Sequence, residues 1–198
     1  ALLSSLTANG NEVAFGTIGD ASTSEGHFWE TINAAGVLQV PMAVSVWDDG
    51  FGISVPNHLQ TTKSSISEVL RGFEKTRDKD GFLIYTAKGW DYAALCNIYE
   101  EGISICREKH IPVLFHITEV TQPLGHSTSG SHERYKTAER LAWEKEFDCI
   151  KQMRKWIIDE SIASGEELDS IEKESVERVK QAKKTAWNNY QKIAMRKN

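Results

Sequence analysis

Residues 13–56 decide the fold of this chain, and they read VAFGTIGDASTSEGHFWETINAAGVLQVPMAVSVWDDGFGISVP. Two short runs, 12–18 and 42–47, are rich in β-branched and aromatic residues and are bounded by Gly or Pro, which is typical of buried parallel strands. The segment between these runs places four small or apolar residues at helical spacing: Phe28, Ile32, Ala35 and Gly36. The stretch therefore predicts a strand–helix–strand unit.

Carboxylates follow both predicted strands at the point where each strand ends. Asp20 follows the first strand, and Asp48 and Asp49 follow the second. Ligands of open parallel sheets bind outside the carboxyl ends of the strands. Oxygen ligands from neighbouring strand ends, beside a helix N-terminus, suit a hard divalent cation that carries a phosphate group.

Further along the chain, strands and helices continue to alternate. We predict strands over residues 82–86 and 111–120, with a helix between them that Asp91 caps and that ends near Lys109. The first helix is expected to begin at a capping box formed by Ser22 and Glu25. Four strands that alternate with helices predict an α/β fold, with a mostly parallel sheet and flanking helices.

The C-terminal third reads as helical. A Gly-, Ser- and His-rich loop is expected over residues 121–134, followed by a helix over 135–158 that breaks near Asp148. Ser164 and Glu167 form a second capping box, which opens a final helix that runs to Met195. We therefore predict an α/β domain over residues 1–134 and a helical C-terminal extension over residues 135–198.

Composition excludes several classes of protein. The 198 residues carry a formal net charge of −5, which argues against a partner recognised mainly through nucleic-acid phosphates. No apolar run is long enough to span a membrane, so no membrane partner is expected. Cys96, Cys106 and Cys149 lack metal-site spacing and fit reduced thiols, which favours a cytoplasmic location.

The motifs resemble a known family. Gly19-Asp20-Ala21 and, some thirty residues later, Asp48-Asp49 resemble the two-part signature of thiamine diphosphate enzymes. Additional motifs resemble the alpha part of the 2-oxo acid dehydrogenases that decarboxylate pyruvate and branched-chain 2-oxo acids: Ser24-Glu25-Gly26, Glu30, Asn33, Gly50-Phe51-Gly52-Ile53-Ser54 and Gly125-His126-Ser127-Thr128-Ser129. The resemblance covers nearly the whole chain and implies a thiamine diphosphate-binding fold.

This resemblance assigns roles to individual residues. It implies that Mg²⁺ is held by Asp20, Asp49 and the backbone carbonyl of Phe51, an oxygen set that Mg²⁺ prefers. The remaining positions are implied to contact the cofactor, through backbone groups near the diphosphate, an apolar contact with the rings, and a catalytic loop histidine: Ala21, Ser22, Ile53 and His126.

The sequence also departs from the family pattern. Asp48-Asp49 replaces Asn-Asn, which adds negative charge beside a diphosphate and requires Mg²⁺ or basic neighbours to offset it. Ala21 replaces Gly, so its backbone must adopt a conformation open to a non-glycine residue. Residues 121–124, Thr-Gln-Pro-Leu, replace a segment in which relatives carry an Arg or a further His.

The resemblance implies oxidative decarboxylation of a 2-oxo acid, with acyl transfer to the lipoyl groups of a dihydrolipoyl acyltransferase. A beta part, fused or separate, is expected to supply the activating glutamate. The residues His126-Ser127-Thr128-Ser129 favour a branched-chain, 2-oxoisovalerate-like substrate over pyruvate. Because the sequence begins as if inside a helix that ends near Thr7, we expect a fragment that lacks an N-terminal segment and is inactive alone.

Alternative functions stay open at this point. A pyruvate or acetoin dehydrogenase uses the same chemistry, and a transketolase-like enzyme fits the Ser-Glu-Gly and His-Ser motifs less well. A non-catalytic assembly domain that kept the fold and lost the cofactor would explain the departures at Ala21 and Asp49. A dinucleotide-binding Rossmann domain is disfavoured because no Gly-x-Gly-x-x-Gly motif follows a strand.

Overall fold

The computed structural model describes residues 10–122, 124–126 and 132–195, and the side chains of this range up to Ile193. The helix expected before Thr7 and the motif residues Ser127-Thr128-Ser129 lie outside the described residues. The chain divides into two compact units, Ala1–Met153 and Arg154–Asn198. The boundary that the sequence suggests at 134/135 stays a prediction.

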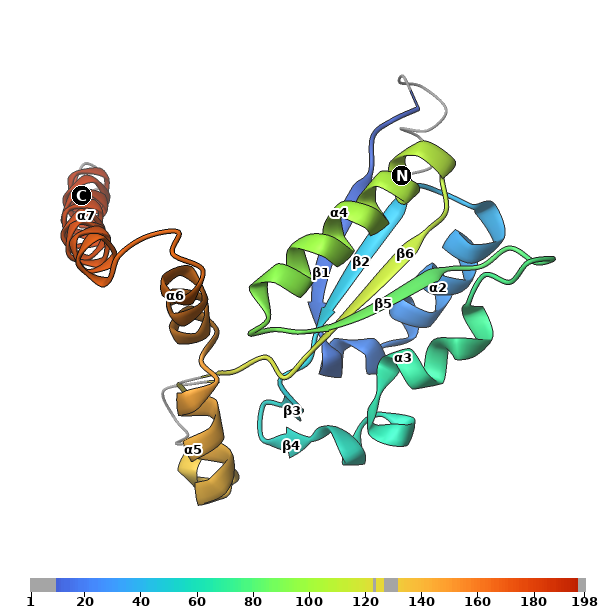
Figure 1. The fold of residues 1–198 in the computed structure, drawn as a ribbon, viewed down its shortest axis with the longest axis horizontal. Helices are drawn as coiled ribbons and strands as arrows, with labels where there is room; N and C mark the ends of the chain where they lie inside the picture. The colour runs from blue at the N-terminus through green and yellow to red at the C-terminus, as the bar shows by residue number, and fades with distance from the viewer. Residues whose placement is uncertain (1–9, 123, 127–131, 196–198) are drawn as a thin grey trace. The chain divides into compact units, whose positions relative to one another are not determined.

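A four-stranded parallel sheet forms the centre of the first unit (Figure 1). In spatial order its strands are β1 (Ala14–Gly19), β2 (Met42–Trp47), β6 (Val113–Thr118) and β5 (Leu83–Lys88). The register aligns Gly19 with Trp47, and Trp47 with Ile117, so the carboxyl ends of three strands meet at one edge of the sheet. The predicted α/β fold with a mostly parallel sheet is confirmed.

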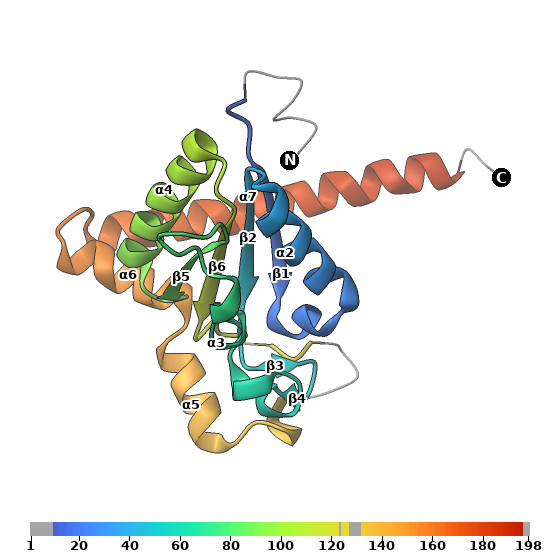
Figure 2. The same ribbon diagram turned by 90° about the vertical axis from the view of Figure 1, so that its right-hand side faces the viewer.

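Helices cover both faces of this sheet. Figure 2 shows α2 (Gly26–Leu38) and α4 (Tyr92–Lys109) on opposite sides of the strands. Successive strand residues point to opposite faces, which creates two cores. The core on the α2 side includes Phe28, Ile32, Val46 and Leu114, and the core on the α4 side includes Ala43, Cys106, Val113 and Phe115.

Helix α4 packs closely on the sheet at a glycine. A Cβ atom added at Gly102 would lie 2.6 Å from Cζ of Phe115, which is itself fully buried. The predicted cap of this helix is confirmed, because Asp91 Oδ1 accepts a hydrogen bond from the backbone N–H of Ala94 at 3.0 Å.

The expected capping box at the start of the first helix is wrong. Residues Asp20–Ser24 form a 3₁₀ helix, η1, in which the Thr23 hydroxyl donates to the Asp20 carbonyl at 2.6 Å. Helix α2 begins only after Glu25, which makes no side-chain cap. The local hydroxyl–carbonyl bond of Thr23 stabilises a tight turn in competition with the capping box.

Short elements connect β2 to β5. They comprise a two-stranded hairpin of β3 (Phe51–Gly52) and β4 (Val55–Pro56), followed by η2 (Asn57–Leu59), η3 (Thr62–Ser64), α3 (Ile66–Val69) and η4 (Leu70–Phe73). The N-cap of α3 is Ser65, whose hydroxyl accepts from the Glu68 N–H at 3.4 Å. The buried residues Ile66 and Leu70 anchor this segment to the core on the α2 side.

The C-terminal helices follow the predicted pattern. After η5 (His132–Arg134) come α5 (Ala138–Glu146), α6 (Cys149–Asp159) and α7 (Gly165–Met195), so the break expected near Asp148 is confirmed. The capping box of α7 is also confirmed, since the Ser164 N–H donates to Glu167 at 2.8 Å and the Glu167 N–H donates to the Ser164 hydroxyl at 3.2 Å. Among the described residues, no helix combines the length and the apolar character needed to cross a membrane.

Candidate functional site

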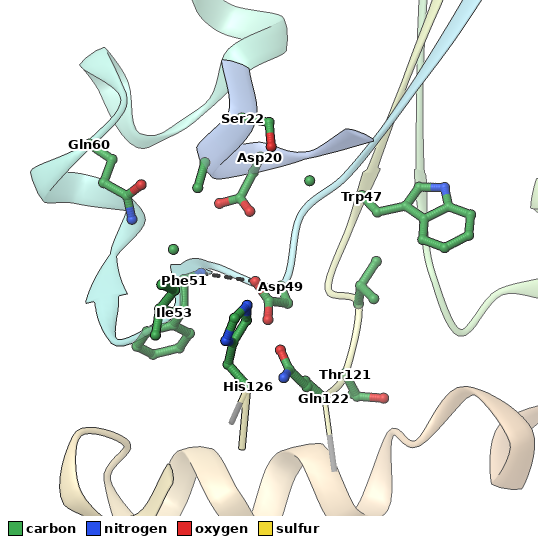
Figure 3. Close-up of a pocket in the computed structure, with 14 residues that line it drawn as sticks. Asp20, Ser22, Trp47, Asp49, Phe51, Ile53, Gln60, Thr121, Gln122 and His126 are labelled. Carbon is green, nitrogen blue, oxygen red and sulfur yellow. Dashed lines mark hydrogen bonds between the residues drawn. The ribbon is translucent and has the colours of Figure 1, made fainter. Parts of the chain in front are cut away.

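A cavity of about 560 Å³ opens where β1, β2 and β6 end (Figure 3). All the site residues predicted from the sequence line it: Asp20, Ala21, Ser22, Asp49, Phe51, Ile53 and His126. The cavity is completed by residues without a predicted role: Gly19, Trp47, Gly52, Gln60, Val120, Thr121 and Gln122. Residues that are up to 107 positions apart in the sequence therefore meet in one place.

Two carboxylates dominate the electrostatics of this cavity. Asp20 is only 6% exposed, and burial together with the nearby Asp48 and Asp49 raises its pKa to about 7. Burial also raises the pKa of Asp49, although the Phe51 N–H and the cations Lys136 and Arg140 oppose this rise. Figure 3 shows Asp20 and Asp49 projecting into the same space. A bound cation would favour the charged form of both groups.

The backbone after β2 forms a tight turn that fixes Asp49. Asp48 Oδ1 accepts a hydrogen bond from the Gly50 N–H at 2.8 Å, and Asp49 Oδ1 accepts one from the Phe51 N–H at 3.1 Å. Gly50 has φ of 82°, a conformation that glycine adopts without steric cost. The Asp48 N–H also donates to the Ile117 carbonyl of β6 at 2.8 Å. The turn is therefore tied to the sheet at its base.

The departure at Asp48 has a structural partner. Oδ2 of Asp48 lies 2.9 Å from Nε2 of His116 on β6, and Nδ1 of His116 lies 2.9 Å from the Ser67 hydroxyl. His116 is 1% exposed and Asp48 is 8% exposed, so the contact is shielded from water. Asp48 does not line the cavity. The Asp48 carboxylate thus connects the turn to β6 through His116, whereas the Asp49 carboxylate faces the cavity.

Sequence reasoning missed His116. A signal was present, since His116 is the polar residue within the buried run Val113-Leu114-Phe115-His116-Ile117, and a buried imidazole needs a partner. Nothing local identified that partner, because Asp48 lies 68 residues away. The order Asp–His–Ser resembles a hydrolytic triad, but the buried ring of His116 is not part of the cavity lining.

Helix α5 and the residues before it clamp the turn from the other side. Arg140 Nη2 donates to the Asp49 carbonyl at 2.7 Å, and the Lys136 ammonium lies 5.1 Å from the centroid of the Phe51 ring. Glu144 holds both cations in place: its carboxylate accepts from Lys136 Nζ at 2.8 and 2.9 Å and from Arg140 Nε at 2.8 Å. These are the basic neighbours that the extra charge at Asp49 requires. No motif or local spacing indicated this clamp.

The segment after Asp49 packs closely against the Gly19-Asp20-Ala21 motif at Gly52. A Cβ atom added there would lie 2.8 Å from Cβ of Ala21 and 2.4 Å from Oε1 of Gln60. Ala21 itself lies in η1, a right-handed conformation open to any residue, so the requirement stated for this position is met. The Ala21 substitution therefore does not distort the turn beside Asp20.

Ile53 adopts a strained backbone conformation. Its φ is 61°, a region that β-branched residues rarely occupy, and its side chain is 62% exposed. Such outliers persist where the surrounding structure imposes them, often at ligand sites. The conformation presents an apolar side chain at the cavity wall, opposite Trp47 (Figure 3).

The far wall of the cavity comes from the loop after β6. His126 lines it together with Thr121 and Gln122, as Figure 3 shows. Thr121 and Gln122 are neutral, and among the described lining residues there is no Lys or Arg side chain. The missing basic contact of the loop is therefore not replaced from elsewhere in the described cavity wall.

The donor set fits a hard cation that brings further ligands with it. Two carboxylates face the cavity, and the turn places the backbone of Phe51 beside them. Within the described ranges, no group of three or more His, Cys, Asp or Glu side chains could hold a metal ion by itself. A Mg²⁺ ion at this site would need oxygen ligands from the backbone, from water and from a bound phosphate.

Comparison with known proteins gives a consistent result. The family model described as "Dehydrogenase E1 component" matches residues 2–194. The chain is 25% identical over 172 residues to the pyruvate dehydrogenase E1 component subunit alpha of Rickettsia typhi, which covers 87% of this chain and 50% of that protein. It is 30% identical over 155 residues to the corresponding subunit of Porphyra purpurea, which covers 78% and 42%.

A relative of a different substrate class is also similar. The chain is 28% identical over 181 residues to the mitochondrial 2-oxoisovalerate dehydrogenase subunit alpha 2 of Arabidopsis thaliana, which covers 88% of this chain and 36% of that protein. The chain thus spans half or less of the length of each of these relatives.

Proposed function

This chain belongs to the dehydrogenase E1 component family, and we propose that it forms the alpha part of a thiamine diphosphate-dependent 2-oxo acid dehydrogenase. One observation supports this most strongly. Seven residues assigned to cofactor and metal binding from sequence motifs line a single cavity at the carboxyl edge of the sheet. These residues come from three separate segments of the chain, 20–22, 49–53 and 126, and the fold brings all three to one cavity.

Asp20 and Asp49 would hold Mg²⁺ in this proposal, with the Phe51 carbonyl as a third ligand. Their raised pKa values mark a site where negative charge is under-compensated, and a divalent cation offsets that charge. Backbone groups of Ala21 and Ser22 would face the diphosphate at the start of η1. The exposed side chain of Ile53 would pack against the cofactor rings.

When bound, thiamine diphosphate supplies the electron sink for decarboxylation of a 2-oxo acid. The residues of this chain would position and orient the metal ion and the cofactor. Asp48, held by His116, and Asp49, held by Arg140, keep the turn rigid, so that the metal ligands need little reorganisation. His126 is proposed as the catalytic residue of the loop, and it would hydrogen-bond to the substrate or to the cofactor phosphate.

We propose that a beta part completes the site. No glutamate side chain lines the described cavity, so the activating carboxylate of the reaction would come from that part. The acyl product would pass to a lipoyl-bearing dihydrolipoyl acyltransferase. A cytoplasmic location remains part of this proposal.

For the substrate we propose a branched-chain, 2-oxoisovalerate-like acid, with pyruvate as the alternative. The branched-chain substrate is supported by the amino-acid sequence of residues 126–129, His-Ser-Thr-Ser. Most of this motif lies outside the described residues. Relatives named for pyruvate and for 2-oxoisovalerate both match the chain. An assay of the complete enzyme with 3-methyl-2-oxobutanoate, pyruvate and an artificial electron acceptor separates the two, and a preference for pyruvate would overturn the branched-chain proposal.

A non-catalytic assembly domain is the second candidate, because Asp48-Asp49 departs from the family's Asn-Asn pair. The structure gives a reason to disfavour it. His116 pairs with Asp48 at 2.9 Å, while Lys136 and Arg140 compensate Asp49, so the added charge is accommodated in place. These contacts explain how the departure is tolerated, and the retained cavity residues, His126 among them, argue against a domain that has lost its ligand.

The decisive experiment measures cofactor binding in the complete enzyme, with alpha and beta parts together. Calorimetric titration of thiamine diphosphate in the presence of Mg²⁺ should show binding, and Asp20→Ala, which removes the oxygen ligand, should abolish the Mg²⁺-dependent part while circular dichroism stays unchanged. Asp91→Ala is a matched control, since Asp91 caps α4 and is not part of the cavity lining. Unaltered affinity in Asp20→Ala would contradict the proposed metal site.

A further inference from the structure

Helix α7 carries an apolar stripe that no described residue of its own unit covers. The helix has 31 residues and is therefore about 46 Å long. Residues spaced by three or four positions fall on one helical face, and this face gathers Leu168, Ile171, Val176, Val179, Ala182, Ala186, Trp187, Tyr190 and Ile193. The six largest from Ile171 onward are between 53% and 67% exposed. An exposed stripe of this extent indicates an interaction surface.

Charge is segregated along the same helix. The N-terminal half, residues 165–177, carries six carboxylates and one lysine, for a net charge of −5. The C-terminal half, residues 178–195, carries one arginine, four lysines and no carboxylate, for a net charge of +5. The helix is therefore a rod with an acidic half, a basic half and an apolar stripe that runs through both.

Interaction with the helix dipole does not account for this pattern. Acidic residues in the first turn and basic residues in the last turn stabilise an isolated helix, but the effect fades beyond these turns. Glu172, Glu177, Lys180 and Lys183 lie well inside the helix. The dipole also gives no reason for aligned apolar side chains on a face exposed to water.

We propose that α7 pairs with α7 of a second copy of this chain, in antiparallel orientation. Antiparallel pairing places each acidic half against a basic half and buries the two stripes against each other. A parallel pair would place acidic against acidic and basic against basic residues, which costs free energy. A two-fold axis across the pair makes every contact occur twice.

The stripe itself indicates the register. Glu172 and Lys183 are the charged residues near its midline. When Glu172 of one copy lies opposite Lys183 of the other, Val176 lies opposite Val179 and Leu168 lies opposite Trp187. In this one register, each charged residue of the stripe lies opposite a residue of opposite charge and each of these apolar residues lies opposite an apolar residue. Glu172 also lies 3.8 Å from Nη1 of Arg154 in its own unit, a contact long enough to leave the carboxylate available.

Sedimentation velocity of the 198-residue chain tests this pairing. The wild type should form a dimer. Glu172→Lys places lysine against lysine and Lys183→Glu places glutamate against glutamate, so each variant should weaken the dimer at least tenfold. Mixing the two variants should restore it, because the lysine introduced at position 172 of one chain then meets the glutamate introduced at position 183 of the other. Glu174→Lys and Lys184→Glu make the same charge changes away from the stripe and should leave the dimer intact.

Each outcome supports or overturns the proposal. Dimerisation that is lost in both variants and regained on mixing supports antiparallel pairing at this register. A monomeric wild type overturns it, and the stripe would then be covered by residues 1–153 or by a different protein. A dimer that survives both variants, or that mixing does not restore, also overturns it. Circular dichroism checks that all variants keep their helix content, and none of these outcomes depends on the cofactor.

Discussion

Asp20 is the residue at which burial and charge conflict most directly. Its carboxyl is 6% exposed, lies beside Asp48 and Asp49, and has a pKa of about 7 instead of 3.8. Without a cation, the folded protein therefore holds a proton that the unfolded chain has released above about pH 4. The same carboxylate becomes favourable once a metal binds, so metal binding near neutral pH should release a proton.

We predict that the metal-free protein loses stability through Asp20 as the pH rises from about 4 to 7. In this window the folded state binds more protons than the unfolded state, so the free energy of unfolding falls with pH. The loss should reach a few kcal/mol, since one pKa unit corresponds to about 1.4 kcal/mol. Urea unfolding of wild type and Asp20→Asn across this range measures it, because the amide does not titrate. A difference between the two proteins that stays constant with pH would contradict the assignment.

Ile53 combines two features that are unfavourable in the protein without ligand: a strained backbone conformation and an exposed apolar side chain. Replacing Ile53 with Gly should raise the unfolding free energy by about 1 kcal/mol, because glycine tolerates a φ of 61° and little buried surface is lost. The same variant should weaken thiamine diphosphate binding in the complete enzyme. Thermal unfolding and calorimetry test the two effects separately, and Ile53→Val, which keeps the strain, serves as the control.

His116 should stabilise the fold mainly through its buried contact with Asp48, beside a second contact with the Ser67 hydroxyl. His116→Leu leaves a buried carboxylate without its partner and should cost about 3 kcal/mol of unfolding free energy. Adding Asp48→Asn removes the unpaired charge, so the double variant should regain at least half of that loss. Denaturant unfolding of the four proteins in this cycle gives the coupling energy. Additive losses would show that the two side chains do not act as a pair.

At the scale of elements, the sequence predicted what local periodicity encodes. The four parallel strands, the Asp91 cap, the break near Asp148 and the Ser164 capping box all follow from spacing within a few residues. The start of α2 did not follow, because Thr23 forms a competing local bond to the Asp20 carbonyl. The cavity lining was also predictable, since motif residues at the carboxyl ends of parallel strands must meet.

The supports of the cavity could not be predicted in this way. Asp48 meets His116 across 68 residues, and Asp49 meets Arg140 across 91 residues. These contacts depend on how helices and strands pack against one another. The periodicity of a single sequence does not show which distant residues that packing brings together. The histidine within the buried run 113–117 was a signal that sequence reasoning did not use, and it would not have identified Asp48 as the partner.

Two helical glycines offer an opposed pair of predictions. A Cβ atom at Gly102 of α4 would lie 2.6 Å from the buried Phe115 ring, so Gly102→Ala should lower the unfolding free energy by about 1–3 kcal/mol. A Cβ atom at Gly36 of α2 would lie 3.5 Å from the Phe82 ring, an ordinary contact, so Gly36→Ala should raise it by about 0.5–1 kcal/mol. Chemical denaturation measures both variants: a stabilised Gly102→Ala would contradict the close packing of α4, and a destabilised Gly36→Ala would contradict the ordinary contact at α2.

At the scale of the whole molecule, the chain presents apolar side chains where a partner is expected. Trp47 and Ile53 line the cavity and are 52% and 62% exposed, and Leu59 and Leu124 are exposed as well. The chain also spans half or less of the length of the relatives described above. The exposed apolar side chains at the cavity are what the proposed shared site requires.

The last prediction is that the 198-residue chain alone neither binds thiamine diphosphate tightly nor decarboxylates 2-oxo acids. Its described cavity wall offers two mutually repelling carboxylates, no basic side chain for the diphosphate and no glutamate for activation. Adding the proposed beta part should supply the glutamate and cover the exposed apolar side chains. Calorimetric titration with thiamine diphosphate and Mg²⁺, beside an artificial-acceptor assay, compares the chain alone with the assembled enzyme. Micromolar binding or clear turnover by the chain alone would show that its own residues complete the site.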